Sequence, residues 1–217
     1  MTEFQTYTVA QMREAEERSV IHGVSLSQLM DNAGHALARC ALDMDPVPPI
    51  LVICGAGNNG GDGYVCAAEL RRRGLDVKAW GIHRDRLAGD SLAGAAAKAY
   101  EDAGGLIRHL TEDIETLSPC GLIIDAVFGT GLSHPVSGVY AHAIRLIRQS
   151  GALVLSCDVP SGIDADTGRV MGDAVRAHVT LMLGLAKPAC YLEPGCDCFG
   201  ETRLADIGIP EDAVTGL

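Results

Sequence analysis

The chain has 217 residues, of which 47% are hydrophobic and 4% aromatic, and its net charge is −11. These values predict a single domain over residues 1–217 with a sizeable core. They argue against nucleic-acid binding, because the sequence has no Lys/Arg-rich stripe that would release counterions. We also expect a cytoplasmic protein without membrane contact. No apolar run reaches the roughly 20 residues that span a bilayer, and the first residues lack a signal-peptide pattern.

Two helices are predicted at the beginning of the chain, before any strand. Residues 10–21 place apolar side chains near one face, with Thr8 as an N-cap candidate. Residues 25–42 show such a pattern over a longer stretch. The prolines of "MDPVPP" then end the second helix.

Strands and helices alternate over the rest of the chain. The expected strands are residues 49–57, 76–83, 105–110, 120–131, 152–162, 178–185 and 198–206. The expected helices between them are residues 61–74, 88–103 and 136–149. Repeated β–α units with short connections predict a parallel sheet with helices on both faces. In such sheets ligands bind beyond the carboxyl ends of the strands.

Three polar segments follow strands and are expected to meet at that edge of the sheet. They are "GAGNNGGDG" at 55–63, "DAVFGTGLSHP" at 125–135 and "DVPSGIDADTG" at 158–168. The segments are far apart in the sequence, so only the fold would bring them together. That these three segments are expected to lie together is the strongest indication of a functional site that the residues alone provide.

The first polar segment contains G-x-G-x-x-G through Gly55, Gly57 and Gly60, the pattern of loops that cradle the phosphates of NAD. Asp62 opposes this interpretation, because we expect it in the first turn of a helix, where a pyrophosphate would sit. The structural alternative is a glycine-rich turn in which the helix dipole stabilises the Asp62 carboxylate. That alternative does not explain the neighbouring asparagine pair.

Two aspartates, Asp125 and Asp158, each end a buried strand. Together with Asn and Ser oxygens at the same edge they suggest a site for a hard cation. An aspartate in this position is also suited to acid–base chemistry, and equally to anchoring a turn. Lys187, after the sixth strand, is placed either to contact a phosphate or carboxamide or to lie on the surface.

Four segments, in this order, resemble the NAD(P)H-hydrate epimerases: "CGAGNNGGDGYVCAAEL", "DAVFGTGL", "CDVPSGIDADTG" and "LGLAKPACYLEPG". The resemblance extends over residues 8–210 and includes the paired N-terminal helices. It implies an α/β fold, a Rossmann-like three-layer αβα sandwich with a mostly parallel sheet. It also implies an isomerase that converts the R epimer of hydrated NADH or NADPH into the S epimer. An ATP- or ADP-dependent dehydratase, separate or fused, would then repair the S epimer.

The resemblance further implies roles for individual residues and a homodimeric assembly. One potassium ion per subunit would be held by Asn59, Asp125 and Ser161. Asp158 would contact the substrate, and our hypothesis is that it gives and takes the proton that epimerisation requires. The other substrate contacts would be Asn58, Asn59, Gly60, Gly61, Asp62, Gly129, Thr130, Gly131, Leu132, Ser133, His134 and Pro135.

The sequence departs from the family at two places. Ala56 stands where the family often has proline, and Ser133–His134 stands where a basic residue usually precedes the proline. The first change should reduce the rigidity of the segment, and the second affects the phosphate or ribose contact. The chain also ends too soon for a dehydratase domain, so we expect either a standalone enzyme or a fragment of a fused one.

Two other functions remain as alternatives. A binding or scaffold module on the same fold is one, although relatives of that type lack a complete N-N-G-G-D-G and D-V-P-S-G-I-D set. An NAD(P)-dependent dehydrogenase is the other. It predicts a change in nicotinamide absorbance with an alcohol or aldehyde, and no requirement for potassium.

Overall fold

The computed structural model describes residues 4–89 and 91–217. Its strands are β1 Ile50–Cys54, β2 Val77–Gly81, β3 Ile107–His109, β4 Leu122–Ala126, β5 Leu153–Cys157, β6 Val179–Leu183 and β7 Glu201–Ala205. Its α-helices are α1 Val9–Ile21, α2 Leu26–Asp43, α3 Asn58–Arg72, α4 Leu92–Asp102, α5 Gly138–Gln149 and α6 Glu211–Val214. Every strand and helix predicted from the sequence therefore has a counterpart in the structure.

The strands form one parallel sheet with the order β3-β2-β1-β4-β5-β6-β7. The direction of winding changes between β1 and β4, which lie side by side from Ile50 opposite Leu122 to Cys54 opposite Ala126. At such a point the connections that follow two neighbouring strands run to opposite faces of the sheet. A crevice therefore opens at the carboxyl ends of the strands.

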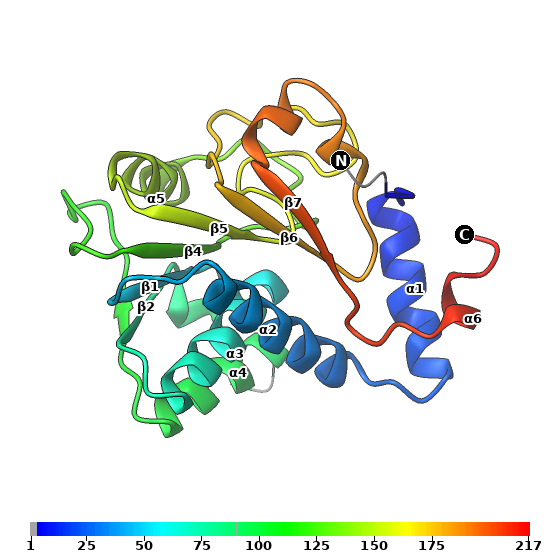
Figure 1. The fold of residues 1–217 in the computed structure, drawn as a ribbon, viewed down its shortest axis with the longest axis horizontal. Helices are drawn as coiled ribbons and strands as arrows, with labels where there is room; N and C mark the ends of the chain where they lie inside the picture. Colours follow the sequence, from blue (N-terminus) through cyan, green and yellow to red (C-terminus); the bar gives the residue numbers. More distant parts are fainter. Residues whose placement is uncertain (1–3, 90) are drawn as a thin grey trace.

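Helices cover both faces of the sheet (Figure 1). The face that carries Val52 and Ile124 packs against α2, α3 and α4, whereas the face that carries Ile53 and Ile123 packs against α5. α1 lies at the β7 side of the molecule beside α6 (Figure 1). This arrangement confirms the predicted three-layer αβα sandwich with two N-terminal helices.

Both N-terminal helices begin with a capped first turn, and the cap of α1 is the predicted Thr8. The Thr8 hydroxyl accepts a hydrogen bond from the backbone N–H of Gln11, and the Gln11 side chain accepts one from the backbone N–H of Thr8, so α1 begins with a capping box. Ser25 caps α2 in a similar way. Within residues 4–89 and 91–217, no helix has both the length and the apolar character that crossing a membrane requires.

The predicted boundary of α3 is wrong by three residues. The sequence placed Asn58 and Asn59 in a loop, because asparagine and glycine are poor helix formers. In the structure α3 begins at Asn58, with Gly57 as its N-cap. Asp62 therefore lies in the second turn of the helix and not in the first, so it does not occupy the position where an anion would meet the helix end.

Candidate active site

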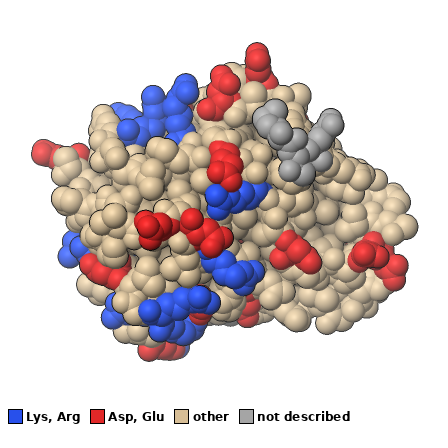
Figure 2. Space-filling model, viewed as in Figure 1, with Lys and Arg blue, Asp and Glu red and all other residues tan. Residues whose placement is uncertain are grey.

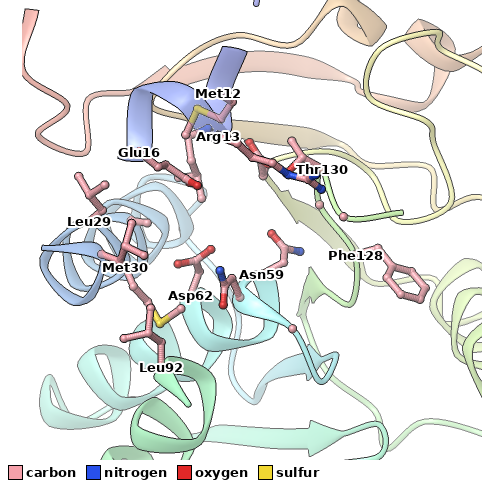
Figure 3. A pocket seen from close by; sticks show the side chains of 18 of the residues that line it. Met12, Arg13, Glu16, Leu29, Met30, Asn59, Asp62, Leu92, Phe128 and Thr130 are labelled. Atoms are coloured by element: carbon pink, nitrogen blue, oxygen red, sulfur yellow. Dashed lines mark hydrogen bonds between the residues drawn. The ribbon is translucent and has the colours of Figure 1, made fainter. Parts of the chain in front are cut away.

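A cavity of about 360 Å³ lies at the carboxyl ends of β1, β4 and β5. Its walls come from α1, α2 and α3 and from the segments after β4, β5 and β6, so it joins the N-terminal helices to the edge of the sheet (Figure 3). The polar residues of the wall are Arg13, Glu16, Asn58, Asn59, Asp62, Thr130, Tyr140, Asp158 and Lys187. The cavity contains residues from all three polar segments, as the sequence predicts.

The α3 end of the cavity combines a helix N-terminus with side-chain amides. Gly57 and Asn58 are exposed at the mouth, and Asn59 and Asp62 follow further inside (Figure 3). The N–H groups and dipole of a helix N-terminus favour an anion at this position. The dinucleotide substrate implied by the resemblance carries a pyrophosphate, which matches this end of the cavity.

The glycines of the first polar segment allow close packing of α3. A side chain at Gly60 would overlap the carbonyl oxygen of Gly55, and a side chain at Gly55 would overlap the carbonyl oxygen of Val127. The turn after β1 is thus pressed between α3 and the segment after β4. The G-x-G-x-x-G pattern is explained by this packing before any ligand is considered.

Asp158 follows β5 and forms a buried ion pair with Lys187. Asp158 adopts a left-handed backbone conformation (φ 67°), and one of its oxygens accepts hydrogen bonds from Lys187 Nζ and from the backbone N–H of Leu183 at 3.2 Å. Lys187 is 0% exposed and also donates to the carbonyl oxygen of Leu183 at 2.8 Å. The surface position that the sequence allowed for Lys187 is therefore wrong.

The second oxygen of Asp158 points toward the cavity. A Cβ built on Gly129 would lie 3.1 Å from Asp158 Oδ2 and 2.9 Å from Asn59 Oδ1. Gly129 thus lies beside both the Asp158 carboxylate and the Asn59 amide. Even the methyl group of an alanine at this position would crowd these two oxygens. The structure brings these three residues together as the sequence predicts.

Asp125 lies beneath the cavity and does not form part of its wall. The residue is 0% exposed, and its carboxylate accepts hydrogen bonds from the Ser156 hydroxyl (2.9 Å) and from the hydroxyl (2.6 Å) and backbone N–H (2.9 Å) of Ser161. Burial raises the pKa of Asp125, and these hydrogen bonds partly offset that effect. The Ser161 hydroxyl oxygen also accepts from the backbone N–H of Phe128, which leads directly to Gly129.

The residues around Asp125 suit a hard cation. Carboxylate, hydroxyl and amide oxygens are ligands for such ions. In the described part of the chain, Asn59 Nδ2 is buried without a hydrogen-bond partner, so the orientation of this amide is not fixed by a protein acceptor. Among the described residues no group of three or more His, Cys, Asp or Glu side chains is placed to hold a metal ion. The oxygens near Asp125 are of the kind that hard cations take as ligands.

Two further carboxyl groups face the cavity, Asp62 from α3 and Glu16 from α1 (Figure 3). Burial raises the pKa of Asp62 well above its ordinary range, and the charges of Asp158 and Glu16 add to this effect while Lys187 opposes it. Burial also raises the pKa of Glu16, with the charge of Asp158 as the next cause. The cavity therefore raises the pKa of both carboxyl groups that lie near the Asp158–Lys187 pair.

The second polar segment contributes only its first part to the cavity. Gly129, Thr130 and Gly131 line the wall, whereas Leu132 to Pro135 continue away from it. Ser133, His134 and Pro135 are exposed, and the hydroxyl of Ser133 lies 2.8 Å from Nδ1 of His134. A substrate that reaches them must extend beyond the cavity.

A second cavity adjoins the first and shares Tyr140 with it. Its lining includes His83, Asp85 and His109 at the ends of β2 and β3, and the rings of His83 and Tyr140 pack edge to face. Asp85 lies in a short 3₁₀-helix that follows β2. The two cavities together follow the carboxyl edge from β5 to β3.

Comparison with known proteins decides the family. The model of the family described as YjeF-related protein N-terminus matches residues 26–189. The chain belongs to this family. An NAD(P)H-hydrate epimerase of Levilactobacillus brevis is 35% identical over 207 residues, which cover 94% of this chain and 93% of that protein. This agrees with the family resemblance that the motifs indicate.

Longer relatives match over part of their length. A bifunctional NAD(P)H-hydrate repair enzyme Nnr of Thermofilum pendens is 42% identical over 207 residues, which are 91% of this chain but 38% of that protein. The chain spans about two fifths of the length of such bifunctional relatives. The crystal structure of the yeast protein YNL200c superimposes with a TM-score of 0.78 at 23% identity, covering 96% of this chain and 91% of that one, which shows the same fold.

Two residues of the cavity were missed or undecided in the sequence. Lys187 is surrounded by apolar residues and glycine in "LGLAKPAC", and a lysine inside such a run is a signal for burial with a partner. Glu16 is one of several acidic residues on α1, and its helical pattern looks like an ordinary solvated face. Its position in the cavity depends on how α1 docks, which no local pattern reveals.

Proposed function

We propose that this chain is an NAD(P)H-hydrate epimerase, an isomerase that converts the R epimer of hydrated NADH or NADPH into the S epimer. The observation that carries the proposal is the Asp158–Lys187 pair, set in a cavity that begins at the N-terminus of α3. Proteins of Levilactobacillus brevis and Elusimicrobium minutum that match this chain over most of their length bear the name NAD(P)H-hydrate epimerase. These names support the activity for this chain.

The hydrated ring carries a hydroxyl on carbon 6, next to the ring nitrogen. Epimerisation requires this hydroxyl to leave, or the ring to open, and then to re-form on the other face. No hydride moves in either course. We propose that Asp158 gives and takes a proton in this exchange, because Lys187 and the N–H of Leu183 hold one of its oxygens and leave the other toward the cavity.

The substrate contacts proposed from the resemblance divide into two groups. Asn58, Asn59 and Asp62 on α3, with Gly129 to Gly131, line the cavity and would hold the nicotinamide half and the adjoining phosphate. Leu132 to Pro135 would be reached only by a more distant part of the dinucleotide. Gly60 and Gly61 are buried in α3 and would act through their backbone.

We propose that one potassium ion per subunit is held by oxygens of Asn59, Asp125 and Ser161. When bound, the ion would supply a fixed positive charge beneath the cavity. The Ser161 hydroxyl accepts a hydrogen bond from the backbone N–H of Phe128, and Asn59 lies beside Gly129, so these two residues also help to position the segment after β4. A homodimer, a cytoplasmic location and a dehydratase that consumes the S epimer complete the proposal. The bifunctional relatives support the last of these.

The direct test incubates the pure chain with the R epimer of hydrated NADH and follows the ratio of epimers by chromatography. We expect the S epimer to form faster than without protein, and faster in potassium than in a large organic cation. A dehydrogenase would instead change the nicotinamide absorbance when an alcohol or aldehyde is added. A scaffold module would bind the dinucleotide or not, but it would leave the epimer ratio unchanged.

A further inference from the structure

α1 lies outside the segment matched by the family model, yet it is attached to the catalytic edge of the sheet. The N–H of Tyr7 donates to the carbonyl oxygen of Ala186 at 2.8 Å, directly beside Lys187. The N–H of Val9 donates to the Asp166 carboxylate at 2.7 Å. Two backbone groups at the beginning of α1 are thus fixed to the segments that follow β5 and β6.

This attachment sets which face of α1 meets the cavity. Met12 packs toward Gly184, where a built Cβ would lie 3.2 Å from Met12 Cε. Glu16 lies one turn further along the same face. Figure 3 shows its side chain entering the cavity from the α1 side, whereas Asp62 and Asn59 enter from α3.

The chemistry at carbon 6 calls for groups on more than one wall. The hydroxyl leaves from one face of the ring and must return on the other, and a single carboxyl group cannot reach both faces of a bound ring. Asp158 is attached to the end of β5 and lies near Asn59 and Gly129. Glu16 is the carboxyl group that the cavity receives from the separate α1 wall.

We propose that Glu16 is a second catalytic residue of this site, which exchanges a proton with the carbon 6 hydroxyl from the α1 wall while Asp158 serves the other face. This inference rests on the proposed epimerase function. It assigns a role to α1, and it takes loss and return of water, in place of ring opening, as the course of the reaction.

The step balances without any further reactant. The Glu16 carboxyl group gives its proton to the carbon 6 hydroxyl, the C–O bond breaks, and water leaves. The lone pair of the ring nitrogen forms a C=N⁺ bond to carbon 6. Water then adds to the other face, the C=N⁺ electrons return to nitrogen, and the proton of the added water passes to the Asp158 carboxylate. Solvent in the cavity carries this proton back to Glu16.

The charges around Glu16 agree with an acid role. Its pKa is raised by burial and by the charge of Asp158, and the Glu17 charge acts in the same direction, while Lys187 and Arg13 lower it. Asp62, whose own pKa is raised, faces it from α3. Glu16 therefore keeps its proton to higher pH than an ordinary glutamate. Activity should fall as pH rises through this raised pKa.

The test compares Glu16→Gln with Glu17→Gln, an identical change at the next, exposed position of the same helix. We expect Glu16→Gln to lower kcat by about 10²–10⁴-fold and to abolish the alkaline limb of the pH profile. Glu17→Gln should retain the kcat and the alkaline limb of the unmodified chain. Glu16→Asp, which keeps the carboxyl group on a shorter stem, should recover part of the rate and the alkaline limb.

Unchanged kcat and pH profile in Glu16→Gln would overturn the inference, and so would an effect confined to KM and thermal stability. A lost alkaline limb in Asp62→Asn, with Glu16→Gln unaffected, would also overturn it and assign the role to Asp62.

A second measurement needs no substitution. Epimerisation by the unmodified chain in H₂¹⁸O should place solvent oxygen on carbon 6 in every product molecule. Epimerisation that retains the original oxygen would overturn the inference and leave the proposed function intact. Absence of epimerisation by the unmodified chain would overturn the proposed function and this inference with it.

Discussion

Asp125 and Asp158 follow the same pattern, an aspartate at the end of a buried strand, and their strands are neighbours in the sheet; only the family resemblance assigns them different roles. The structure separates them. Asp125 is sealed beneath the cavity, and its oxygens are satisfied by neutral donors from Ser156 and Ser161. Asp158 is 7% exposed, faces the cavity and is paired with a buried ammonium group. The comparison teaches that the partners of a strand-end aspartate, and not its place in the sequence, decide what it can do.

The difference in partners follows from the connections after each strand. After β4 the chain continues through Phe128, whose N–H donates to Ser161. Asp125 is left facing two serines, Ser156 on β5 and Ser161 in the segment that follows β5. The chain after β5 turns in a left-handed conformation at Asp158, which directs that side chain toward Lys187. Asp125 is thereby suited to support the segment after β4, and Asp158 is suited to act on a ligand.

The largest effect is expected for Asp158→Asn. Epimerisation should fall by about 10²–10⁴-fold, the usual cost of losing an acid–base group. The variant should also lose about 3–5 kcal/mol of unfolding free energy, because Lys187 is left buried without its counter-ion. Chemical denaturation and the epimer-resolved assay measure the two effects. The double variant Asp158→Asn/Lys187→Met should regain stability without regaining activity, and recovery of activity would contradict the role of Asp158.

Asp125→Asn should affect stability more than catalysis. The NH₂ group of the new asparagine would face hydrogen-bond donors of Ser156 and Ser161, and two donors cannot bond to each other. We therefore expect a loss of about 1–3 kcal/mol in unfolding free energy. Ser156→Ala removes one donor and keeps the carboxylate, and it should cost about 0.5–1.5 kcal/mol. Denaturation in potassium and in a large organic cation checks both variants. A potassium response that persists in Asp125→Asn would remove Asp125 from the proposed cation site.

Asp62→Asn should change how stability depends on pH. The folded pKa of Asp62 is raised above its unfolded value, so its contribution is fully present below the unfolded pKa, near 4 for aspartate. That contribution is lost as pH rises through the folded pKa. The melting temperature of the unmodified chain should therefore fall with rising pH more steeply than that of Asp62→Asn. Asp31→Asn, an exposed control on α2, should leave the slope unchanged.

The smallest effect is expected for His134→Ala. His134 is exposed and lies outside the cavity, so the unfolding free energy should change by less than about 0.5 kcal/mol. If the segment reaches the dinucleotide, as the resemblance implies, KM should rise while kcat is retained, because the contact would serve binding alone. A fall in kcat comparable to that of Asp158→Asn would show that His134 takes part in catalysis, and it would contradict the conclusion that this segment lies outside the active site.

Much of the fold could be predicted because its signals are local. Apolar runs and glycine–proline breaks predicted every strand and the helices α1 to α5, although not the short α6, and Thr8 forms the cap that the sequence indicates. The beginning of α3 could not be predicted, because the low helix propensity of Asn58 to Gly61 is overcome by close packing against the turn after β1. That packing exists only in the folded chain.

The part of the site that follows the ends of strands could be predicted from the sequence. Asp158, Asn59 and Gly129 meet as the topology requires. Glu16 and Lys187 come from segments that no spacing rule connects to the others, and only the docking of α1 beside Ala186 brings Glu16 to the cavity. Tertiary contacts of this kind leave no periodic signal in the sequence.

The most direct test measures the rate at which the pure chain, Asp158→Asn/Lys187→Met and Ser156→Ala each convert the R epimer of hydrated NADH into the S epimer. The difference between the two aspartates predicts rapid conversion by the unmodified chain and by Ser156→Ala, which changes only the sealed environment of Asp125. It predicts near loss of conversion in the double variant, although that variant remains folded. Equal rates in all three proteins, or no conversion by the unmodified chain, would contradict the assignment of the Asp158 cavity as the epimerase site.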